Sequence, residues 1–326
     1  MMPPRLRVAL PWLQLALAEA VASATLPTLE SLAWLGGRGR LQTVAGVGWR
    51  DWLLDPLGGA SILSAAPAGP ALAACRGQVV DGTGSWCLAQ PVHLAAGLDH
   101  VRMGALQAAQ PNAAEAAALA ATIAAHFADD GLAVIAFVDG AWLLRFDADV
   151  QCDTQPPDAV VGHDVHAAMP SGRDGARVRS LTNEVQMLLH EHPVNLQRER
   201  ARLEPINGWW LWGFGSRAPV PLAATAGWSL RGDDPWLRAL WAESGAPEVS
   251  ALQGDTLIAV SRPPSAQNAQ ALADIDAGLL HPLAAQVRNG ALQQLELLLG
   301  DRELTVTRAA RWSCWRRPLD VSGWLG

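Results

Sequence analysis

The feature that most constrains the fold is an unbroken run of bulky apolar residues near the middle of the chain, Trp209-Trp210-Leu211-Trp212. A strand with one face in water alternates apolar and polar residues, whereas a strand of a parallel sheet is covered on both faces and is apolar throughout. Gly213-Phe214-Gly215 follows the run at once. The pattern therefore predicts a buried parallel strand whose carboxyl end carries two glycines.

Strands and helices are expected to alternate on both sides of this run. Leu6 to Leu10 is a short apolar run typical of a buried strand, and a helical stretch follows Leu26-Pro27-Thr28. Nearer the other end, Ala269 to Val287 has apolar residues at helical spacing, and two strand-like runs meet across Gly300-Asp301. Such alternation predicts an α/β fold with a mainly parallel sheet.

A second, smaller α+β domain is expected within the chain. Asn112 and Glu115 form a capping box that begins a helix, and Gly131 ends it. Two strand-like runs then meet across Asp139-Gly140, a dipeptide that favours a tight hairpin turn. The stretch from Gly46 to Gly82 is rich in Gly, Pro and Ala and is the expected boundary region.

The composition narrows the range of partners. Half of the residues are hydrophobic and 17% are charged, as in ordinary globular proteins, which excludes a disordered chain. The formal net charge of −7 gives no general attraction to nucleic acid or to anionic lipid. No stretch of the sequence is long and apolar enough to span a bilayer. We therefore expect neither a nucleic acid nor a membrane as partner.

Cysteine usage and the N-terminus bear on localisation. The spacing of the four cysteines is not that of metal ligands and does not suggest a disulfide framework. They are Cys75, Cys87, Cys152 and Cys314. This favours a reducing, cytoplasmic location. Two arginines followed by the apolar stretch Val8 to Leu17 imitate a secretion signal, but a buried first strand followed by a helix produces the same profile. Both interpretations of the N-terminus stay open.

The candidate binding site lies just before the tryptophan-rich run. Asn183, Gln186 and His190 share one face of a predicted helix, and Pro193 ends that helix. His192, Asn195 and Arg198 then follow around the turn. Arginine offers a planar fork of donors that matches carboxylate or phosphate, and Asn and His add neutral donors. The cluster suits a small anionic metabolite, held close to the backbone at Gly213 and Gly215.

Two other interpretations of the polar residues compete with this one. The helix stripe is also typical of a solvated face, with Arg198, Arg200 and Arg202 as surface charges. A second candidate cluster consists of His163, Asp164 and His166. The histidine pairs His163/His166 and His190/His192 have the residue type of a metal site. These histidine pairs lack a flanking set of carboxylates, so we expect neither a metal nor another cofactor.

The central segment also resembles known families. "LTNEVQMLLHEHPVNLQRERARLEPINGWWLWGFG", with "GHDVHAAMPSG" before it, resembles the bacterial regulatory proteins of the RpfE type. More distantly, it is similar to the archaeal-type cofactor-independent phosphoglycerate mutases of the alkaline phosphatase superfamily. Further similar segments are "TLPTLESLAWLGGRGRL", "LLDPLGG", "AEAAALAATIAAHF" and "ALADIDAGLLHPLAAQV". The resemblance implies an alkaline-phosphatase-like core at residues 1–75 and 206–326 and an inserted α+β domain at 76–205, and it adds Asn207 to the ligand-binding residues.

Departures from that family bear on activity. Its mutases use two metal ions and a serine that carries the phosphoryl group. The carboxylate expected after the first strand falls at Pro11-Trp12, and Thr43 is the only hydroxyl side chain between Leu41 and Ala60. The late Asp-His motif corresponds to Arg311-Trp312-Ser313, and His281 is the sole histidine after Arg217. The resemblance therefore implies a relative without the family's metal ligands.

Three functions follow as hypotheses. The first is a catalytically silent relative with a regulatory role that binds a small anionic ligand or a protein partner. The second is an active phosphoryl-transfer enzyme, mutase-like or phosphatase-like, with a site rebuilt around His163, Asp164, His166 and His190. The third is a partner-binding surface made of tryptophans and arginines, for which the candidates are Trp312, Trp315 and Trp324 with Arg311, Arg316 and Arg317. Packing of this C-terminal segment on the core is the alternative to the third hypothesis.

Overall fold

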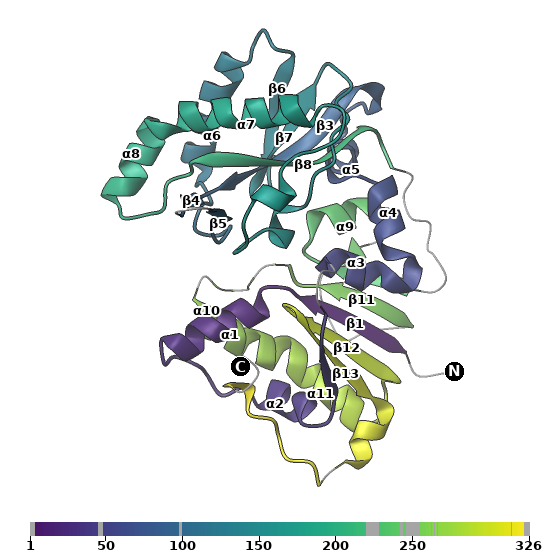
Figure 1. Ribbon diagram of the computed structural model, residues 1–326. Coiled ribbons are helices and arrows are strands. Elements are labelled where there is room, and N and C mark those ends of the chain that lie inside the picture. The colour runs from purple at the N-terminus through teal and green to yellow at the C-terminus, as the bar shows by residue number, and fades with distance from the viewer. Residues whose placement is uncertain are drawn as a thin grey trace. The chain divides into compact units, whose positions relative to one another are not determined.

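The protein consists of two compact units (Figure 1). The first contains Met1–Ile62 and Pro221–Gly326, and the second contains Leu63–Val220. The computed structural model describes residues 4–44, 48–97, 100–219, 228–241, 244–245, 254–261, 263, 265, 267–313 and 315–322. Within this part of the chain, no helix is long and apolar enough to cross a membrane.

The first unit is built on a seven-stranded, mainly parallel sheet with the order β10-β9-β11-β1-β12-β13-β2. Strand β1 is central and pairs in parallel with β11 and β12, while β13 and β2 add an antiparallel edge. The bounds are β1 (Arg5–Leu10), β2 (Arg40–Thr43), β9 (Trp228–Gly232), β10 (Ser244–Gly245), β11 (Asp255–Ala259), β12 (Gln294–Leu299) and β13 (Arg302–Thr307). The expected buried first strand and mainly parallel sheet are confirmed.

One face of this sheet is covered by a layer of helices (Figure 1). Side chains alternate along a strand, so Leu6, Val8 and Leu10 all point into this layer. The helices are α1 (Leu13–Ala22), α2 (Glu30–Gly36), α10 (Asn268–Ile275) and α11 (His281–Arg288), with a π-helical turn, η4 (Asp276–Leu280), between the last two. The carboxylate of Asp276 accepts the backbone amides of Ser31 and Leu32, which ties this turn to the start of α2.

The other face of the sheet carries a buried arginine. Arg7 of β1 pairs with Glu296 of β12 at 3.0 Å, and its guanidinium lies 4.1 Å from the Trp52 ring of α3 (Trp49–Leu54). Burial lowers the pKa of Arg7, although the nearby carboxylates oppose that shift. The remaining helices of this unit are η1 (Asp55–Leu57), α9 (Pro235–Leu240) and η5 (Arg308–Trp312), and α4 (Gly59–Ala65) spans the boundary between the units.

The second unit is built on a four-stranded antiparallel sheet with the order β6-β7-β3-β8. Helix α6 (Ala113–His126) begins at the predicted capping box of Asn112 and Glu115, and the hairpin turns at Asp139-Gly140, which both have positive φ. The strands are β3 (Asp81–Val92), β6 (Leu132–Val138), β7 (Ala141–Phe146) and β8 (Gly208–Arg217). The small elements are β4 (Leu94–Ala96), β5 (Val101–Met103), η2 (Pro157–Ala159) and η3 (His166–Ala168). The predicted helix and hairpin are confirmed.

The tryptophan-rich run lies in this second sheet, so its assignment to a parallel sheet was wrong. It forms β8, which pairs antiparallel with β3 at the sheet edge. Trp209 and Leu211 pack in the core beside α6 and α7 (Gly175–His190), while Trp210 is buried on the opposite face and donates its indole N–H to the Gln155 carbonyl at 2.8 Å. Cover on both faces makes the run apolar, whatever the direction of its neighbour.

The two units also differ from the predicted domains at both boundaries. Residues 63–75 and 206–220, which were assigned to the core at 1–75 and 206–326, belong to the second unit. The physical reason is α5 (Ala68–Cys75), which packs on β3 and β8. A Cβ at Gly69 would lie 2.5 Å from the Trp86 carbonyl oxygen of β3, so α5 and that sheet are in close contact.

Candidate functional site

His192 caps the short helix α8 (Pro193–Arg200) from within the protein. Its Nδ1 accepts the backbone N–H of Val194 at 3.2 Å, and its Nε2 lies 2.9 Å from Oγ1 of Thr122. Because Nδ1 is an acceptor, Nε2 carries the proton and donates to Thr122, whose hydroxyl in turn donates to the Ala118 carbonyl. Burial lowers the pKa of His192, in keeping with a neutral ring.

Asn195 joins the end of α7 to the start of β8. Its Nδ2 donates to the carbonyls of Leu189 at 2.7 Å and Ile206 at 2.8 Å. Its Oδ1 accepts the N–H of Ile206 at 2.8 Å. The side chain is buried, and three of its hydrogen-bonding positions are occupied by the backbone. Asn195 therefore fixes the path of the chain between α8 and β8.

Arg198 is buried as well, with 3% of its surface exposed. Its Nε donates to the Glu204 carbonyl at 2.8 Å, and its Nη2 donates to the Ala108 carbonyl at 2.8 Å. Its Nη1 donates to the Gln110 carbonyl at 3.2 Å and to the Glu115 carboxylate at 3.0 Å. Four acceptors from three segments thus occupy the fork that was expected to bind an anion.

The other predicted residues of this cluster lie apart from the buried trio. Asn183 and His190 are exposed on α7, and Gln186 is half-buried. Arg200 and Arg202 are exposed, as the solvated-face interpretation predicts. Asn207 pairs with the backbone of Leu94, accepting its N–H at 2.7 Å and donating to its carbonyl at 2.9 Å. The structure does not bring these side chains into one pocket with His192, Asn195 and Arg198.

Gly213 and Gly215 contact a helix of the protein itself. A Cβ at Gly213 would lie 2.9 Å from the Ala68 Cβ, and Gly213 has a φ of +69°. A Cβ at Gly215 would lie 3.0 Å from the Pro70 side chain. Both glycines were expected to let a ligand approach the backbone, but here it is α5 that approaches.

The second candidate cluster is exposed and self-contained. His163 and His166 are both at the surface, with His163 Nδ1 3.0 Å from the Val161 carbonyl. Asp164 accepts the backbone N–H of His166 at 3.2 Å. Among the residues that the structure describes, no three His, Cys, Asp or Glu side chains gather as a metal site would require. The predicted grouping of these residues with His190 is therefore wrong.

The carboxyl edge of the parallel strands carries a site that sequence reasoning missed. Asp234, which follows β9 and is 2% exposed, caps α9 by accepting the Leu237 N–H at 2.9 Å. Its other oxygen accepts from Arg50 at 2.8 Å and 3.2 Å. The Arg50 guanidinium lies 4.2 Å from the Trp49 ring and 5.5 Å from the Trp236 ring. This edge holds a buried ion pair enclosed by tryptophans.

The same edge is closed next to β1. Trp12, which stands where the resemblance calls for a carboxylate, donates its indole N–H to the Val260 carbonyl at 3.0 Å. Arg311-Trp312-Ser313, the late position that the resemblance indicated, follows β13, which runs antiparallel to β12, and therefore lies near the start of β12 and not at this edge. The residues that follow β12, next to the end of β1, are Gly300-Asp301.

The C-terminal segment presents exposed tryptophans. Trp312 is 67% exposed and Trp315 is 75% exposed, whereas most tryptophans of the described chain are buried. The Arg311 guanidinium lies 4.6 Å from the Trp312 ring, and Arg316 is exposed. Trp324 lies outside the described residues. Exposed tryptophans beside arginines are typical of binding surfaces.

Comparison with known proteins gives partial matches to one group of enzymes. The chain is 27% identical over 121 residues to a 2,3-bisphosphoglycerate-independent phosphoglycerate mutase of Methanosarcina barkeri, over 36% of the chain and 30% of that protein. It is 42% identical over 64 residues to mutase 2 of Methanothermobacter thermautotrophicus, over 19% of the chain and 16% of that protein. These matches thus span less than a third of the curated relatives, and no protein family model matches the chain.

Two solved structures resemble the whole chain at low sequence identity. The cofactor-independent phosphoglycerate mutase of Thermoplasma acidophilum has a TM-score of 0.42 and 16% identity, covering 98% of this chain and 94% of that one. The PH0037 protein of Pyrococcus horikoshii has a TM-score of 0.48 and 12% identity, covering 99% and 92%. The resemblance to RpfE-type proteins stays a prediction. By sequence, the chain is a distant relative of the archaeal cofactor-independent phosphoglycerate mutases over part of its length.

Proposed function

We propose that this protein is a catalytically silent relative of the cofactor-independent phosphoglycerate mutases that acts by binding, in a regulatory role. The observation that carries the proposal is the Arg50–Asp234 pair at the carboxyl edge of the parallel sheet. Ligands and metals of open α/β sheets are held at this edge. Here Arg50 forms an ion pair with Asp234, the carboxylate that would otherwise bind a ligand or a metal at this edge.

The ion pair is costly to open. One oxygen of Asp234 caps α9 and the other accepts from Arg50 at 2.8 Å, so a metal ion would have to displace the guanidinium from beside Trp49 and Trp236. Separating a buried pair leaves an uncompensated charge and costs about 3 to 5 kcal/mol. Two-metal phosphoryl transfer needs carboxylates that are free to bind metal. This favours a structural role for Asp234.

The central segment supports the same proposal. The three groups that would hold an anion, His192, Asn195 and Arg198, are engaged by the backbone, by Thr122 and by Glu115. Their residue types are kept, but their hydrogen bonds hold α6, α7, α8 and β8 together. A function through a protein partner is therefore favoured over capture of a phosphorylated metabolite at this segment.

An activity assay tests the proposal. Purified protein is incubated with 3-phosphoglycerate and manganese, and 2-phosphoglycerate is measured through coupled enolase. We expect no turnover above a reaction without protein, and no stoichiometric manganese or zinc by elemental analysis.

Two variants separate real activity from contamination. Arg198→Gln changes a buried arginine of the segment, and Arg200→Gln changes an exposed neighbour. Turnover that persists in Arg200→Gln and disappears in Arg198→Gln, with circular dichroism showing both variants folded, would overturn the proposal.

A further inference from the structure

We infer that residues 308–313 and 315–322, together with Trp34 and Arg288, form a docking surface for an extended acidic segment of a partner protein. The inference rests on the proposed function, because a protein that acts by binding requires such a surface. Three observations carry it: exposed tryptophans, arginines that pair with no carboxylate of the described residues, and an adjoining apolar pocket.

The exposed tryptophans are energetically expensive. Trp312 and Trp315 leave 67% and 75% of their surfaces in water, although burying apolar surface stabilises by about 25 cal/mol per Å². Leu319, further along the same segment, is 38% exposed. Large apolar side chains that gather in one short exposed segment are typical of interaction sites.

The charge of the segment is of one sign. Residues 304–319 contain four arginines and no Asp or Glu, in a chain whose net charge is −7. Within the described part of the chain, no ion pair is made by Arg308, Arg311, Arg316 or Arg317, whereas the neighbouring Arg302 pairs with Asp301 at 3.5 Å. Arg308, Arg316 and Arg317 are exposed and available to carboxylates from outside, whereas Arg311 is half-buried.

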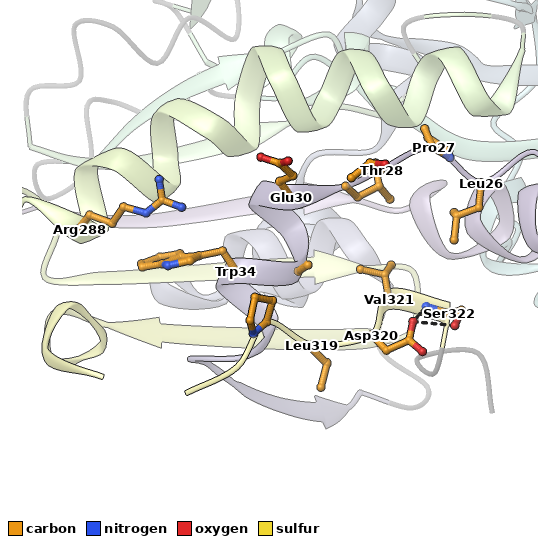
Figure 2. A pocket seen from close by; sticks show the side chains of 13 residues that line it. Leu26, Pro27, Thr28, Glu30, Trp34, Arg288, Leu319, Asp320, Val321 and Ser322 are labelled. Carbon is orange, nitrogen blue, oxygen red and sulfur yellow. Dashed lines mark hydrogen bonds between the residues drawn. The ribbon is translucent and has the colours of Figure 1, made fainter. Parts of the chain in front are cut away.

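An apolar pocket adjoins the segment. Figure 2 shows the side chains that line this pocket, which come from α2, the end of α11 and residues 318–322, among others. The volume of the pocket is about 530 Å³. Leu26, Leu319 and Val321 contribute apolar surface, and Arg288 lies 4.4 Å from the Trp34 ring at its edge. Such a space accommodates an apolar side chain of the peptide. The Arg288 guanidinium can then donate hydrogen bonds to the carboxylate of an adjacent Asp or Glu of the peptide.

The segment is held in place before a partner arrives. The Leu319 N–H donates to the Ala33 carbonyl at 2.9 Å. A Cβ on Gly37 would overlap the Arg317 carbonyl, so the segment runs directly against the end of α2. A surface that is already ordered loses less conformational entropy on binding than a free tail.

The pocket also argues against a nucleic acid as the occupant. Glu30 and Asp320 also line it (Figure 2), and a continuous row of phosphates would meet both carboxylates. A peptide avoids that repulsion by placing its apolar residue there and its carboxylates along the arginines. The occupant is therefore an acidic peptide segment with apolar residues between its charges.

The inference is tested with a fluorescein-labelled 12-residue peptide that alternates Glu with Leu and Phe. We expect saturable binding to the full chain, measured by anisotropy, that weakens as salt is raised. Trp312→Ala/Trp315→Ala should raise Kd at least about tenfold, because the apolar anchors are lost. Arg316→Gln/Arg317→Gln should raise Kd several-fold and flatten the salt dependence.

The matched control is Met187→Ala/Arg200→Gln, which changes an exposed apolar residue and an exposed arginine in the second unit. Its Kd should equal that of the unchanged protein. Absence of saturable binding below about 1 mM, or equal binding by all variants, would overturn the inference.

Tighter binding of a 12-residue oligothymidylate, or of phosphatidylglycerol vesicles, than of the peptide would also overturn the inference. The activity assay reports on the proposed function independently. Lost peptide binding without turnover overturns only the docking surface, whereas turnover overturns the proposed function.

Discussion

Arg198 and Asn112 share one acceptor: the same oxygen of Glu115 accepts Arg198 Nη1 at 3.0 Å and the backbone N–H of Asn112 at 2.8 Å. Glu115 thereby closes the capping box of α6 and neutralises the buried arginine of α8. Two elements separated by about eighty residues in sequence are joined through one carboxylate. Arg198, which the sequence suggested as an anion-binding residue, therefore links α8 to the start of α6.

Replacing this arginine should destabilise the second unit. Arg198→Gln leaves the Glu115 charge and several buried carbonyls without their partner, and we expect a loss of about 3 kcal/mol in the free energy of unfolding. Urea denaturation measures it. Arg200→Gln, at an exposed position, should change the free energy by less than about 0.5 kcal/mol. Equal effects of both substitutions would contradict the structural role.

His192 should make stability depend on pH. Burial lowers its pKa in the folded protein, so the unfolded chain takes up the proton first as the pH falls. The stabilisation is complete above the ordinary histidine pKa of about 6.5 and is lost as the pH falls through the folded-state pKa, with a slope of at most about 1.4 kcal/mol per pH unit.

The measurement compares unfolding free energies between pH 8 and pH 5 for the unchanged protein and His192→Asn, in which an asparagine keeps a cap for α8. The variant should show the shallower slope. His190→Asn, at an exposed position of α7, should retain the original slope. A slope that is unchanged in His192→Asn would exclude this residue as the cause.

Gly213 should tolerate alanine less well than Gly77. Both have positive φ, +69° and +72°, so the backbone strain from a Cβ is similar. A Cβ at Gly213 would lie 2.9 Å from the Ala68 side chain, whereas nothing lies within 4 Å of one at Gly77. We expect Gly77→Ala to cost about 1 kcal/mol and Gly213→Ala about 1 to 3 kcal/mol more, by urea denaturation. Equal costs would mean that α5 is not held against β8.

Cys152 should react slowly with disulfide reagents. Burial, and then Asp153 and Asp174, raise the pKa of its thiol to about 11. At pH 8 about 0.1% is thiolate, and after allowing for the greater nucleophilicity of a basic thiol we expect a rate at least about tenfold below that of glutathione. In a Cys75→Ser/Cys314→Ser variant, the rate of reaction with DTNB should still rise tenfold per pH unit near pH 10. A plateau near pH 9 would contradict the raised pKa.

Most of the helices and strands could be predicted from local sequence patterns. The capping box of Asn112 and Glu115 and the turn at Asp139-Gly140 involve residues close in sequence, so their signals could be recognised directly. The run at Trp209 identified a strand covered on both faces, but it could not give the direction of the neighbouring strand. That depends on β3, more than a hundred residues earlier.

The candidate site was harder to predict for the same reason. The sequence around an arginine does not show whether its hydrogen-bond acceptors come from a ligand or from the protein itself. The acceptors of Arg198 include the carbonyls of Ala108 and Gln110, about ninety residues earlier in the chain. Arg50 and Asp234 are 184 positions apart, in segments with weak periodicity, and no local signal joins them. Residue types pointed to anion chemistry, and only tertiary contacts show which groups are already occupied.

The central place of β1 has a consequence for the order of events on the ribosome. Its partners β11 and β12 begin about 250 and 290 residues later, and at roughly 5 to 20 residues per second they emerge tens of seconds after it. The four strands of the β6-β7-β3-β8 sheet are all synthesised within that interval. The growing chain must therefore hold an apolar strand without its partners while an entire sheet is synthesised after it, which leaves Leu6 to Leu10 exposed to chaperones during translation.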